Sequence, residues 1–468
     1  MEHEMISNAI MKTLAEAGYE AFLVGGCVRD LLLGREPADY DITTSAMPEE
    51  TEMLFEGREL VPGEICRTVG IGKKHGTIGV IFRGVSYEVT TYRVDGAYTD
   101  NRHPDSVQFT RSLAEDLARR DFTVNALAMD RFGQIAEQAE ARGILAQGLR
   151  DLQDGVLRAV GEADRRFDED ALRILRGVRF AAQLGFDVEE TTADAIHRKK
   201  ALLHHIAPER IRVELTKLLC APAGERREPA AVRVLRAYRD VFAEVIPELA
   251  EGFDFDQQNP FHCYTVYEHE LQALAAVIRE ENDEPDETVR LAALLHDVGK
   301  PACFVIRDGW GHFYGHEQRS AEMAEAILRR LRYDNRTVRD VTELIRAHGA
   351  VFNLNEKYAR RKLNQLGEQQ LLRLIRLERA DVSAQAEAVR AERVARIGEF
   401  EQIVRAVLES LQCFSLRDMA LSGEDLKELG IPEGPEIGRI LRAVFDRVLA
   451  GELTNEQEVL IEEARKMR

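Results

Sequence analysis

The stretch of residues 22–44 constrains the fold more strongly than any other part of the chain. An apolar run ends at Gly25 and Gly26, an apolar-patterned segment follows, and Asp39 and Asp41 come after it. This order predicts a strand, a glycine turn, a helix and a second strand. Because side chains two residues apart on a strand face the same side, the two carboxylates are expected to project together beside the glycine turn.

Two carboxylates held this close repel each other, and a hard divalent cation with a phosphate-bearing substrate is the usual reason for such an arrangement. A glycine turn also lets the backbone approach a triphosphate. Each feature alone is more often a plain turn or a solvated loop. Their closeness in the chain predicts a site that binds a metal and a phosphate together.

The composition sets broader limits. A chain of 468 residues, 45% hydrophobic and 31% charged, predicts a soluble globular protein of roughly two to four domains. The net charge of -19 argues against a non-specific nucleic-acid binder, which needs an overall basic field. The first twenty residues predict an amphipathic helix without a signal-peptide core, and no apolar run is long enough to span a bilayer. A cytoplasmic location is therefore expected.

The cysteines are scattered and contain no Cys-x-x-Cys pair, so neither a disulfide framework nor a thiolate zinc site is expected. They are Cys27, Cys66, Cys220, Cys263, Cys303 and Cys413.

Residues 77–92 are rich in β-branched and aromatic side chains and are broken at Arg83-Gly84, which predicts a hairpin. Glu88 would add a third carboxylate to the sheet that carries Asp39 and Asp41, although an exposed strand glutamate is the commoner case.

Residues 93–110 are polar and contain glycine and proline, which predicts a long loop. Arg119 and Arg120 then precede an apolar-patterned segment. An arginine fork matches phosphate, so either side chain could grip a triphosphate, and an exposed basic pair is the equal alternative.

Beyond Asp151 nearly the whole chain has helical periodicity, which predicts a mixed α/β head followed by a long helical body. In the predicted helix of residues 169–182, the side chains of Asp170, Arg173 and Arg176 share the arc that the apolar stripe leaves open. Asp170 and Arg173 are neighbours on that arc and could form a simple ion pair. Alternatively, an accepting carboxylate beside a donating guanidinium matches the base edges of cytosine and adenine, whereas guanine and uracil present the reverse order.

The segment from Arg165 to Lys217 carries eleven Lys and Arg against nine Asp and Glu, so it is relatively basic within an acidic chain. It could face RNA phosphates. Residues 221–229 then predict a connector, and the glycines around Pro435 predict a turn and a helix start.

A second group of chemically active residues lies between His262 and Asp381. The apolar segment 291–301 carries the adjacent pair His296-Asp297 and ends near a glycine. One such histidine is more often a satisfied core residue, but several on consecutive helices can converge on a metal. The further members of this group are His269, His316 and His348.

Four motifs in fixed order resemble one family. They are Leu23-Val-Gly-Gly-x-Val-Arg-Asp30, Asp39-x-Asp41, Arg119-Arg-Asp-x-Thr-x-Asn125 and Glu169-Asp-x-x-Arg-x-x-Arg-x-x-Arg-Phe180. Together they resemble the class II tRNA nucleotidyltransferases and bacterial poly(A) polymerases. The second half of the chain resembles the HD-domain extension that many bacterial members carry.

The resemblance implies a multidomain α+β protein with a polymerase-β-like head that contains a small mixed sheet. The implied domains are a nucleotidyltransferase head at 1–150, an all-α neck at 151–225, an HD-like helical body at 245–400 and a helical tail at 401–468. The neck would bind the base and RNA, and the body and tail would hold tRNA.

The resemblance also implies roles for single residues. Asp39 and Asp41 would be the catalytic carboxylates that bind Mg²⁺, and Asp170 and Arg173 would read the C or A base. The remaining nucleotide-binding residues would be Gly26, Arg29, Arg120, Arg176 and Arg179. The implied chemistry is in-line attack of the tRNA 3′-hydroxyl on the α-phosphate of CTP or ATP.

Three activities compete within such a family, namely whole CCA addition, addition of A alone, and poly(A) synthesis. The long segment 93–110 disfavours members that add only CC, and CCA addition leads. An alternative from another class is metal-dependent phosphohydrolysis, with a second divalent metal at His269, His296, Asp297 and Asp381. A non-catalytic RNA-binding protein is a third hypothesis.

Overall fold

The computed structural model describes residues 2–96, 106–224, 226–281, 284–409 and 416–467. It contains two compact units, Met1–Arg226 with Arg233–Pro247, and Arg227–Val232 with Glu248–Arg468. The expected domain limits at residues 150 and 400 fall inside helices α5 (Arg142–Asp154) and α18 (Glu387–Glu409). The finer division into four domains stays a prediction.

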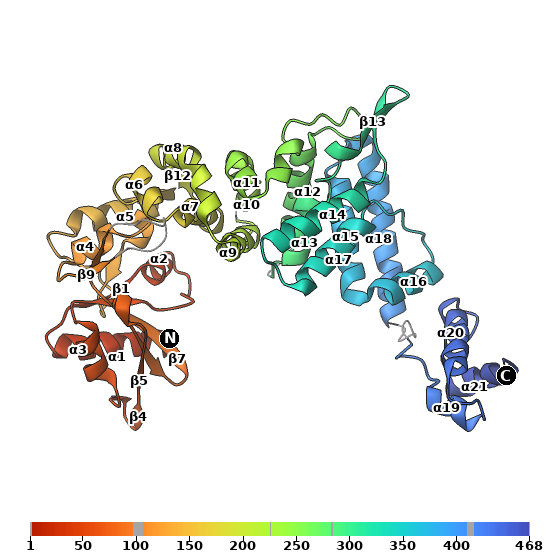
Figure 1. Cartoon of the computed structure of the whole chain (residues 1–468), viewed down its shortest axis with the longest axis horizontal. Coiled ribbons are helices and arrows are strands. Elements are labelled where there is room, and N and C mark those ends of the chain that lie inside the picture. The colour runs from red at the N-terminus through yellow and green to blue at the C-terminus, as the bar shows by residue number, and fades with distance from the viewer. Residues whose placement is uncertain (1, 97–105, 225, 282–283, 410–415, 468) are drawn as a thin grey trace. The chain divides into compact units, whose positions relative to one another are not determined.

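The first unit begins with a mixed sheet, as the family resemblance implies, and this sheet has six strands (Figure 1). β2 and β7 are parallel, and the other neighbouring strands are antiparallel. In spatial order the strands are β10 (Ala128–Met129), β1 (Ala21–Val24), β2 (Ile42–Thr44), β7 (Val85–Thr91), β6 (Thr77–Phe82) and β5 (Arg67–Gly72).

Helices cover this sheet because each carries one apolar face. α1 (Glu2–Glu16) buries Ile6, Ile10 and Leu14, which recur at helical spacing, and it packs on β1 and β2. α3 (Pro48–Phe55) contacts both α1 and strands β5, β6 and β7. The head also contains α2 (Gly26–Leu32), α4 (Leu113–Ala118), β3 (Glu59–Val61) and β4 (Glu64–Ile65).

The predicted hairpin of residues 77–92 is confirmed as β6 and β7. Its turn residues Arg83 and Gly84 both have positive φ, 49° and 79°, which is the backbone twist that two-residue hairpins favour. The predicted long loop at 93–110 is wrong at both ends, where β8 (Arg93–Asp95) pairs antiparallel with β9 (Val107–Phe109). Valine and phenylalanine in these short segments favour strand pairing. Residues 97–105 lie outside the described part of the chain.

A helical segment follows the head and forms the neck. The all-α expectation is wrong in one place, where β11 (Val156–Leu157) pairs parallel with β12 (Asp187–Val188). Two-residue strands carry too short a pattern to be seen in a sequence. The neck helices are α5, α6 (Ala163–Glu169), α7 (Leu172–Leu184), α8 (Glu190–Lys199), α9 (Pro208–Leu219), α10 (Ala230–Ala237) and α11 (Arg239–Val245).

The second unit is mainly helical, and α12, α13, α15 and α17 pack against one another. Its hairpin, β13 (Phe304–Arg307) and β14 (Trp310–Phe313), contradicts the purely helical expectation. The turn residues Asp308 and Gly309 have φ of 52° and 82°, a strong hairpin signal that the helical interpretation overlooked. The helices are α12 (Val266–Glu280), α13 (Glu287–Leu295), α14 (His316–Arg330), α15 (Asn335–Ala347), α16 (Glu356–Leu366), α17 (Glu368–Ser383) and α18.

The last three helices surround a small apolar core that includes Leu426, Ile440, Phe445 and Leu460. The predicted helix start at Pro435 is confirmed, because α20 begins there. The three helices are α19 (Gly423–Glu428), α20 (Pro435–Leu449) and α21 (Gln457–Lys466).

Of the residues that the structure describes, no helix is both long and apolar enough to cross a lipid bilayer. The five cysteines within this part of the chain are all free thiols, as expected.

Candidate active site

The glycine turn between β1 and α2 brings an arginine close to the backbone. Gly25 has φ of 82°, a conformation that residues with a side chain rarely adopt. A Cβ atom at this position would lie 3.2 Å from Nη1 of Arg120. Gly26 begins α2 directly after this turn. The double glycine therefore permits both the tight turn and the approach of the guanidinium.

Asp39 and Asp41 lie just before β2, so the prediction that they lie within a strand is wrong. The ladder begins only at Ile42, although the Asp41 carbonyl accepts a hydrogen bond of 3.0 Å from the N–H of Val24. The expected alternation is nevertheless present, because Asp39 is exposed, Tyr40 is buried and Asp41 is half-buried.

Glu88 lies beside Asp41 because β2 and β7 are parallel and Ile42 faces Val89. Burial, followed by the charges of Asp39 and Glu88, raises the pKa of Asp41 to about 6, while Arg120 opposes the shift. Three carboxylates offer only oxygen donors, which suit a hard divalent cation. Among the described residues, these three do not form a group with all ligand atoms within 4.8 Å.

Asp116 holds the two arginines of this site, Arg119 and Arg120, in place. It is fully buried and pairs with Arg119 at 2.7 Å and with Arg120 at 3.4 Å, while the Thr43 hydroxyl lies 3.2 Å from its Oδ2. Burial alone would raise the pKa of Asp116, but the two guanidinium groups hold it below its ordinary value. The Nε of Arg120 is buried without a hydrogen-bond partner. This guanidinium is thus held above the glycine turn with a free donor.

Arg29 connects the turn to the neck through two buried side chains. Its Nη1 donates to Asn125 at 2.7 Å, and Asn125 donates to Asp121 at 3.2 Å. Asp121 accepts two hydrogen bonds from Arg176 on α7, at 2.8 and 2.6 Å. The start of α2 beside the glycine turn and helix α7 therefore share one polar network.

Asp170 and Arg173 do not form the simple ion pair that their spacing allows. α6 ends at Glu169 and α7 begins at Leu172, so Asp170 occupies an extended break with φ of -137° rather than the predicted helix. Its carboxylate accepts the Leu172 N–H at 3.0 Å and pairs with Arg210 at 3.2 Å.

Arg173 is buried and has different partners. Its guanidinium donates to Glu169 at 2.7 Å and to the carbonyl oxygens of Arg166 and Arg119 at 3.2 and 3.0 Å. Arg173 therefore joins α6, α7 and the segment after α4.

Three guanidinium groups of the first unit lie over the aromatic ring of Phe180. Arg179 lies 3.6 Å from its ring centroid, and Arg29 and Arg176 each lie 5.2 Å away. Arg179 also pairs with the buried Glu214 at 2.8 Å.

Sequence reasoning assigned no role to several residues that position these arginines. Asp121, Asn125, Glu169 and Phe180 all lie inside the quoted motifs, and their position between arginines was the available signal. The structure brings Gly26, Arg29, Arg120 and the head carboxylates to one region and links Arg176 to it through Asp121.

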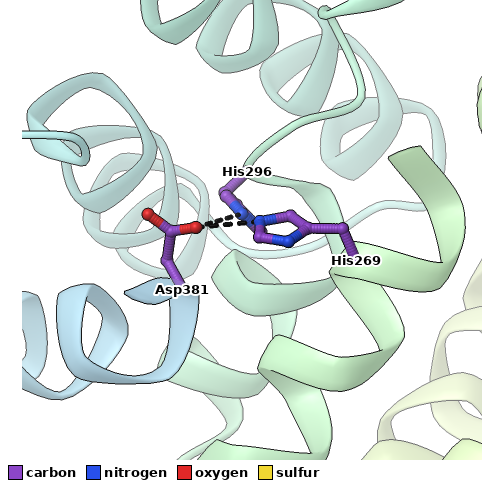
Figure 2. A group of neighbouring side chains, drawn as sticks. All are labelled: His269, His296 and Asp381. Atoms are coloured by element: carbon purple, nitrogen blue, oxygen red, sulfur yellow. Dashed lines mark hydrogen bonds and ion pairs between the residues drawn. The ribbon is translucent and has the colours of Figure 1, made fainter. Parts of the chain in front are cut away.

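The second predicted site lies within the second unit. His269 on α12 and Asp381 on α17 meet with Nε2 and Oδ1 at 2.8 Å, and His296 approaches the same oxygen at 3.8 Å (Figure 2). Asp297 lies against both histidines, at 3.4 and 3.3 Å. All four side chains are buried. The predicted ligands therefore converge.

Burial and the neighbouring histidines act in opposite directions on these carboxylates. Burial alone would raise the pKa of Asp381, but hydrogen bonds and charges from His269 and His296 hold it well below its ordinary value. The carboxylate is therefore ionised and available as a ligand. His269, His296 and Asp381 have ligand atoms within 4.8 Å of one another.

Comparisons with known families cover most of the chain. Residues 21–158 match the poly A polymerase head domain. Residues 185–252 match the family "Probable RNA and SrmB- binding site of polymerase A". Residues 307–464 match a family described as domain 2 of tRNA nucleotidyltransferases.

Full-length relatives are also found. The CCA-adding enzyme of Streptococcus thermophilus is 35% identical over 97% of this chain and 94% of its own. That of Geobacillus stearothermophilus is 34% identical over 96% and 93%.

Among solved structures, the Bacillus stearothermophilus CCA-adding enzyme in complex with CTP has a TM-score of 0.63 and 29% identity, covering 98% of this chain and 96% of its own. The Thermotoga maritima CCA-adding enzyme complexed with tRNA, at 21% identity, has a TM-score of 0.57 over 99% and 95%. The second likeness concerns the fold alone, and both agree with a mixed-sheet head and a helical body.

Proposed function

This chain belongs to the family of CCA-adding enzymes, and from that membership we propose that Asp39 and Asp41 form the centre at which it adds C and A to the 3′ end of tRNA. The reaction is a nucleotidyl transfer that uses CTP and ATP. The full-length likeness to CCA-adding enzymes favours whole CCA addition over addition of A alone or poly(A) synthesis.

The observation that carries the proposal is the meeting of Asp41, Glu88 and Arg120 beside Gly25. The raised pKa of Asp41 reflects burial and repulsion between carboxylates, which a divalent cation would relieve. An all-oxygen donor set fits Mg²⁺. When bound, Mg²⁺ would neutralise charge on the triphosphate and activate the attacking oxygen.

The residues of this chain would position the nucleotide. Arg120, with its free Nε, would donate to a phosphate oxygen, and Gly26 would admit the triphosphate to the backbone. Arg29 would contact the nucleotide from the last turn of α2. The 3′-oxygen of tRNA forms a bond to the α-phosphorus while the bond to the departing pyrophosphate breaks. Glu88 is proposed as a third carboxylate of the centre.

Base selection would fall to Asp170 and Arg173, an acceptor and a donor that match cytosine and adenine. Arg176 and Arg179 would contact sugar or phosphate. In the structure, Arg173 already bonds to Glu169 and two carbonyl groups, so its free donors are fewer than the sequence implies. Since tRNA is the substrate, we place the activity in the cytoplasm.

The test is incorporation of labelled CTP and ATP into three substrates: tRNA that lacks CCA, tRNA that lacks only the final A, and an unrelated RNA. We expect full CCA on the first, A on the second and none on the third. Asp41→Asn should reduce the rate by about a thousandfold or more, because it removes several kcal/mol of transition-state stabilisation.

Glu36→Gln is the matched control, because it removes an exposed carboxylate from the same loop and should leave the rate unchanged. An Asp41→Asn enzyme with normal incorporation would exclude the proposed centre. Long A tracts on the unrelated RNA would instead identify a poly(A) polymerase.

A second activity, metal-dependent hydrolysis of phosphate esters, is favoured by the second site. A cavity of about 340 Å³ opens over Asp297 and is lined also by Lys300 and Arg393, whose charges suit an anion. We expect the full chain to hydrolyse bis(p-nitrophenyl) phosphate with Mn²⁺ or Co²⁺ and Asp381→Asn to lose this activity. Equal hydrolysis by both proteins would exclude the assignment.

A further inference from the structure

The ring of Phe180 has three cationic neighbours, which come from two different helices. The guanidinium carbon of Arg179 lies 3.6 Å from the ring centroid, and those of Arg29 and Arg176 each lie 5.2 Å away. In the rest of the described chain, each aromatic ring that meets a cation meets only one. Arg29 belongs to α2, whereas Phe180 and the other two arginines belong to α7. One aromatic side chain therefore joins two helices whose arginines are proposed to bind the nucleotide.

Tight packing holds this ring in place. Phe180 is 6% exposed, and its ring meets that of Phe122 edge to face, with the centroids 6.0 Å apart and the planes at 78°. Phe122 is itself fully buried against α7, where a Cβ atom at Gly177 would lie 2.9 Å from its Cζ. The ring of Phe180 is therefore a fixed surface for the three guanidinium groups.

Each of the three guanidinium groups also pairs with a carboxylate. The pairs are Arg29 with Asp30 at 2.8 Å, Arg176 with Asp121 at 2.6 Å and Arg179 with Glu214 at 2.8 Å. A carboxylate occupies N–H donors, whereas an aromatic face attracts the whole cation and leaves its donors for other partners. The ring thus holds the arginines without competing with a phosphate for their N–H groups.

Arg176 has such a donor to offer. Its Nε and Nη2 both donate to Asp121, at 2.8 and 2.6 Å, and within the described part of the chain its Nη1 donates to no residue. Its side chain is 35% exposed, against 10% for Arg29 and 8% for Arg179. Of the three guanidinium groups, that of Arg176 is the most accessible to a ligand, and Phe180 restrains its position.

We propose that Phe180 is a positioning residue for nucleotide binding, whose ring holds Arg29 and Arg176 where they meet the incoming CTP or ATP. This role rests on the nucleotide-binding roles proposed above for these arginines. A guanidinium group that is already in place loses less conformational freedom when the triphosphate binds, which strengthens binding. The attraction between cation and ring is also greater in a site sheltered from water. Loss of the aromatic face should therefore weaken the binding of CTP and ATP.

The test removes the aromatic face in two ways. Phe180→Leu keeps a buried apolar side chain and should raise the KM for CTP and ATP by about tenfold or more, while kcat and the KM for tRNA change by less than about twofold. Mono-, di- and trifluorophenylalanine at position 180 nearly keep the shape of the ring and progressively weaken its negative face. Across this series the KM for CTP should rise with each added fluorine, whereas the melting temperature should stay nearly constant.

Phe55→Leu is the matched control. Phe55 is also a helical residue of the first unit and is fully buried, and no cation lies over its ring in the part of the chain that the structure describes. This variant should lower the melting temperature about as much as Phe180→Leu does but leave the KM for CTP unchanged. Arg176→Ala tests the arginine by itself and should raise that KM.

A raised KM in Arg176→Ala beside an unchanged KM in Phe180→Leu would overturn the role of the ring and leave that of the arginine intact. Unchanged KM values in both variants would contradict the nucleotide-binding role proposed for Arg176, and the role of Phe180 with it. A KM that rises in Phe180→Leu but stays constant across the fluorinated series would overturn the role of the aromatic face in favour of packing alone. A rise of equal size in Phe55→Leu would also overturn the proposal, because general loosening of the unit would explain it.

Discussion

The raised pKa of Asp41 makes the folding stability of the metal-free protein depend on pH. Burial and the charges of Asp39 and Glu88 raise its pKa to about 6. The folded state therefore binds this proton more tightly than the unfolded chain does. The ionised carboxylate destabilises the fold above pH 6, and this penalty disappears as the pH falls toward the ordinary carboxyl pKa, near pH 4.

Asp41→Asn should consequently stabilise the chelator-treated protein at pH 7.5 by roughly 1–2 kcal/mol, allowing for solvent screening. The gain should shrink to nothing near pH 4. Thermal melts across this pH range measure it, with Glu36→Gln as a control that removes an exposed charge from the same loop. An equal gain at both pH values would show that charge repulsion is not the cause.

Arg173→Ala should weaken both base selection and packing. Removal of its guanidinium takes one donor from Glu169, which keeps Arg166, and removes the side-chain donor to the carbonyl oxygens of Arg166 and Arg119, which should cost about 1–3 kcal/mol of folding stability. If Arg173 also reads the base, incorporation of UMP and GMP should rise relative to CMP and AMP.

Competition between the four labelled nucleotides measures that selectivity. Arg165→Ala is the control, because Arg165 also pairs with Glu169, at 3.4 Å, but is 73% exposed at its side chain. The control should retain both selectivity and stability. A slower Arg173→Ala enzyme with intact selectivity would contradict the base-reading role.

The position and partner of Asp170 could not be predicted from the sequence. Helical spacing correctly placed Arg173, Arg176 and Arg179 on one helix, but it could not reveal the break between α6 and α7. The partner of Asp170, Arg210, lies forty residues away. Contacts of this range depend on tertiary packing, which no local period encodes.

At the scale of elements, Asp121 joins α2 and α7 to the 3₁₀ turn at Thr123–Asn125. Burial alone would raise its pKa, but Arg176 lowers the pKa of Asp121 to about 2. The ionised form therefore stabilises the fold above about pH 4, and this contribution is lost as the pH falls toward 2.

Asp121→Asn should destabilise the protein by about 2 kcal/mol at pH 7 and raise the KM for CTP, because Arg29 and Arg176 lose their common anchor. Urea unfolding and nucleotide titration measure the two effects. Asp164→Asn breaks an exposed pair with Arg198 and should cost less than about 1 kcal/mol. Equal losses in the two variants would argue against a coupling role for Asp121.

The same substitution should affect folding stability differently at two glycines of α5. A Cβ at Gly148 would lie 2.5 Å from the backbone oxygen of Thr123, whereas one at Gly143 meets nothing within 4 Å. Gly148→Ala should therefore destabilise by about 1–3 kcal/mol or more. Gly143→Ala should be neutral or stabilise by up to about 1 kcal/mol, because alanine favours helix. Paired thermal melts decide, and losses of equal size would contradict the close packing at Gly148.

Elements with long periodic patterns were predictable, and short pairings were not. The hairpin of β6 and β7 and the buried face of α1 follow from alternation and helical spacing. The pairing of β11 with β12 involves two residues on each side, too few for any pattern. The hairpin at Asp308-Gly309 did carry a readable turn signal, which the surrounding helical periodicity obscured.

The division into two compact units makes a prediction about the whole molecule. A fragment of residues 1–247 should fold cooperatively and bind CTP with nearly the affinity of the full chain. Its KM for tRNA should rise by about tenfold or more, because phosphate contacts supply much of RNA affinity. Calorimetry and steady-state kinetics test this, and a fragment without a cooperative transition would contradict the two-unit organisation.

The parallel pairing of β2 with β7 also determines the order in which the strands of the head can pair during folding. Thr43 and Thr90, which pair across these strands, lie 47 residues apart, whereas β6 and β7 close as a local hairpin. Non-local pairing forms late because the intervening loop must first be closed. Asp41 meets Glu88 only at that step. A nascent head therefore cannot assemble its three carboxylates until β7 has emerged from the ribosome, whereas the sheet is complete only once β10, which follows β7 in the chain, has emerged as well.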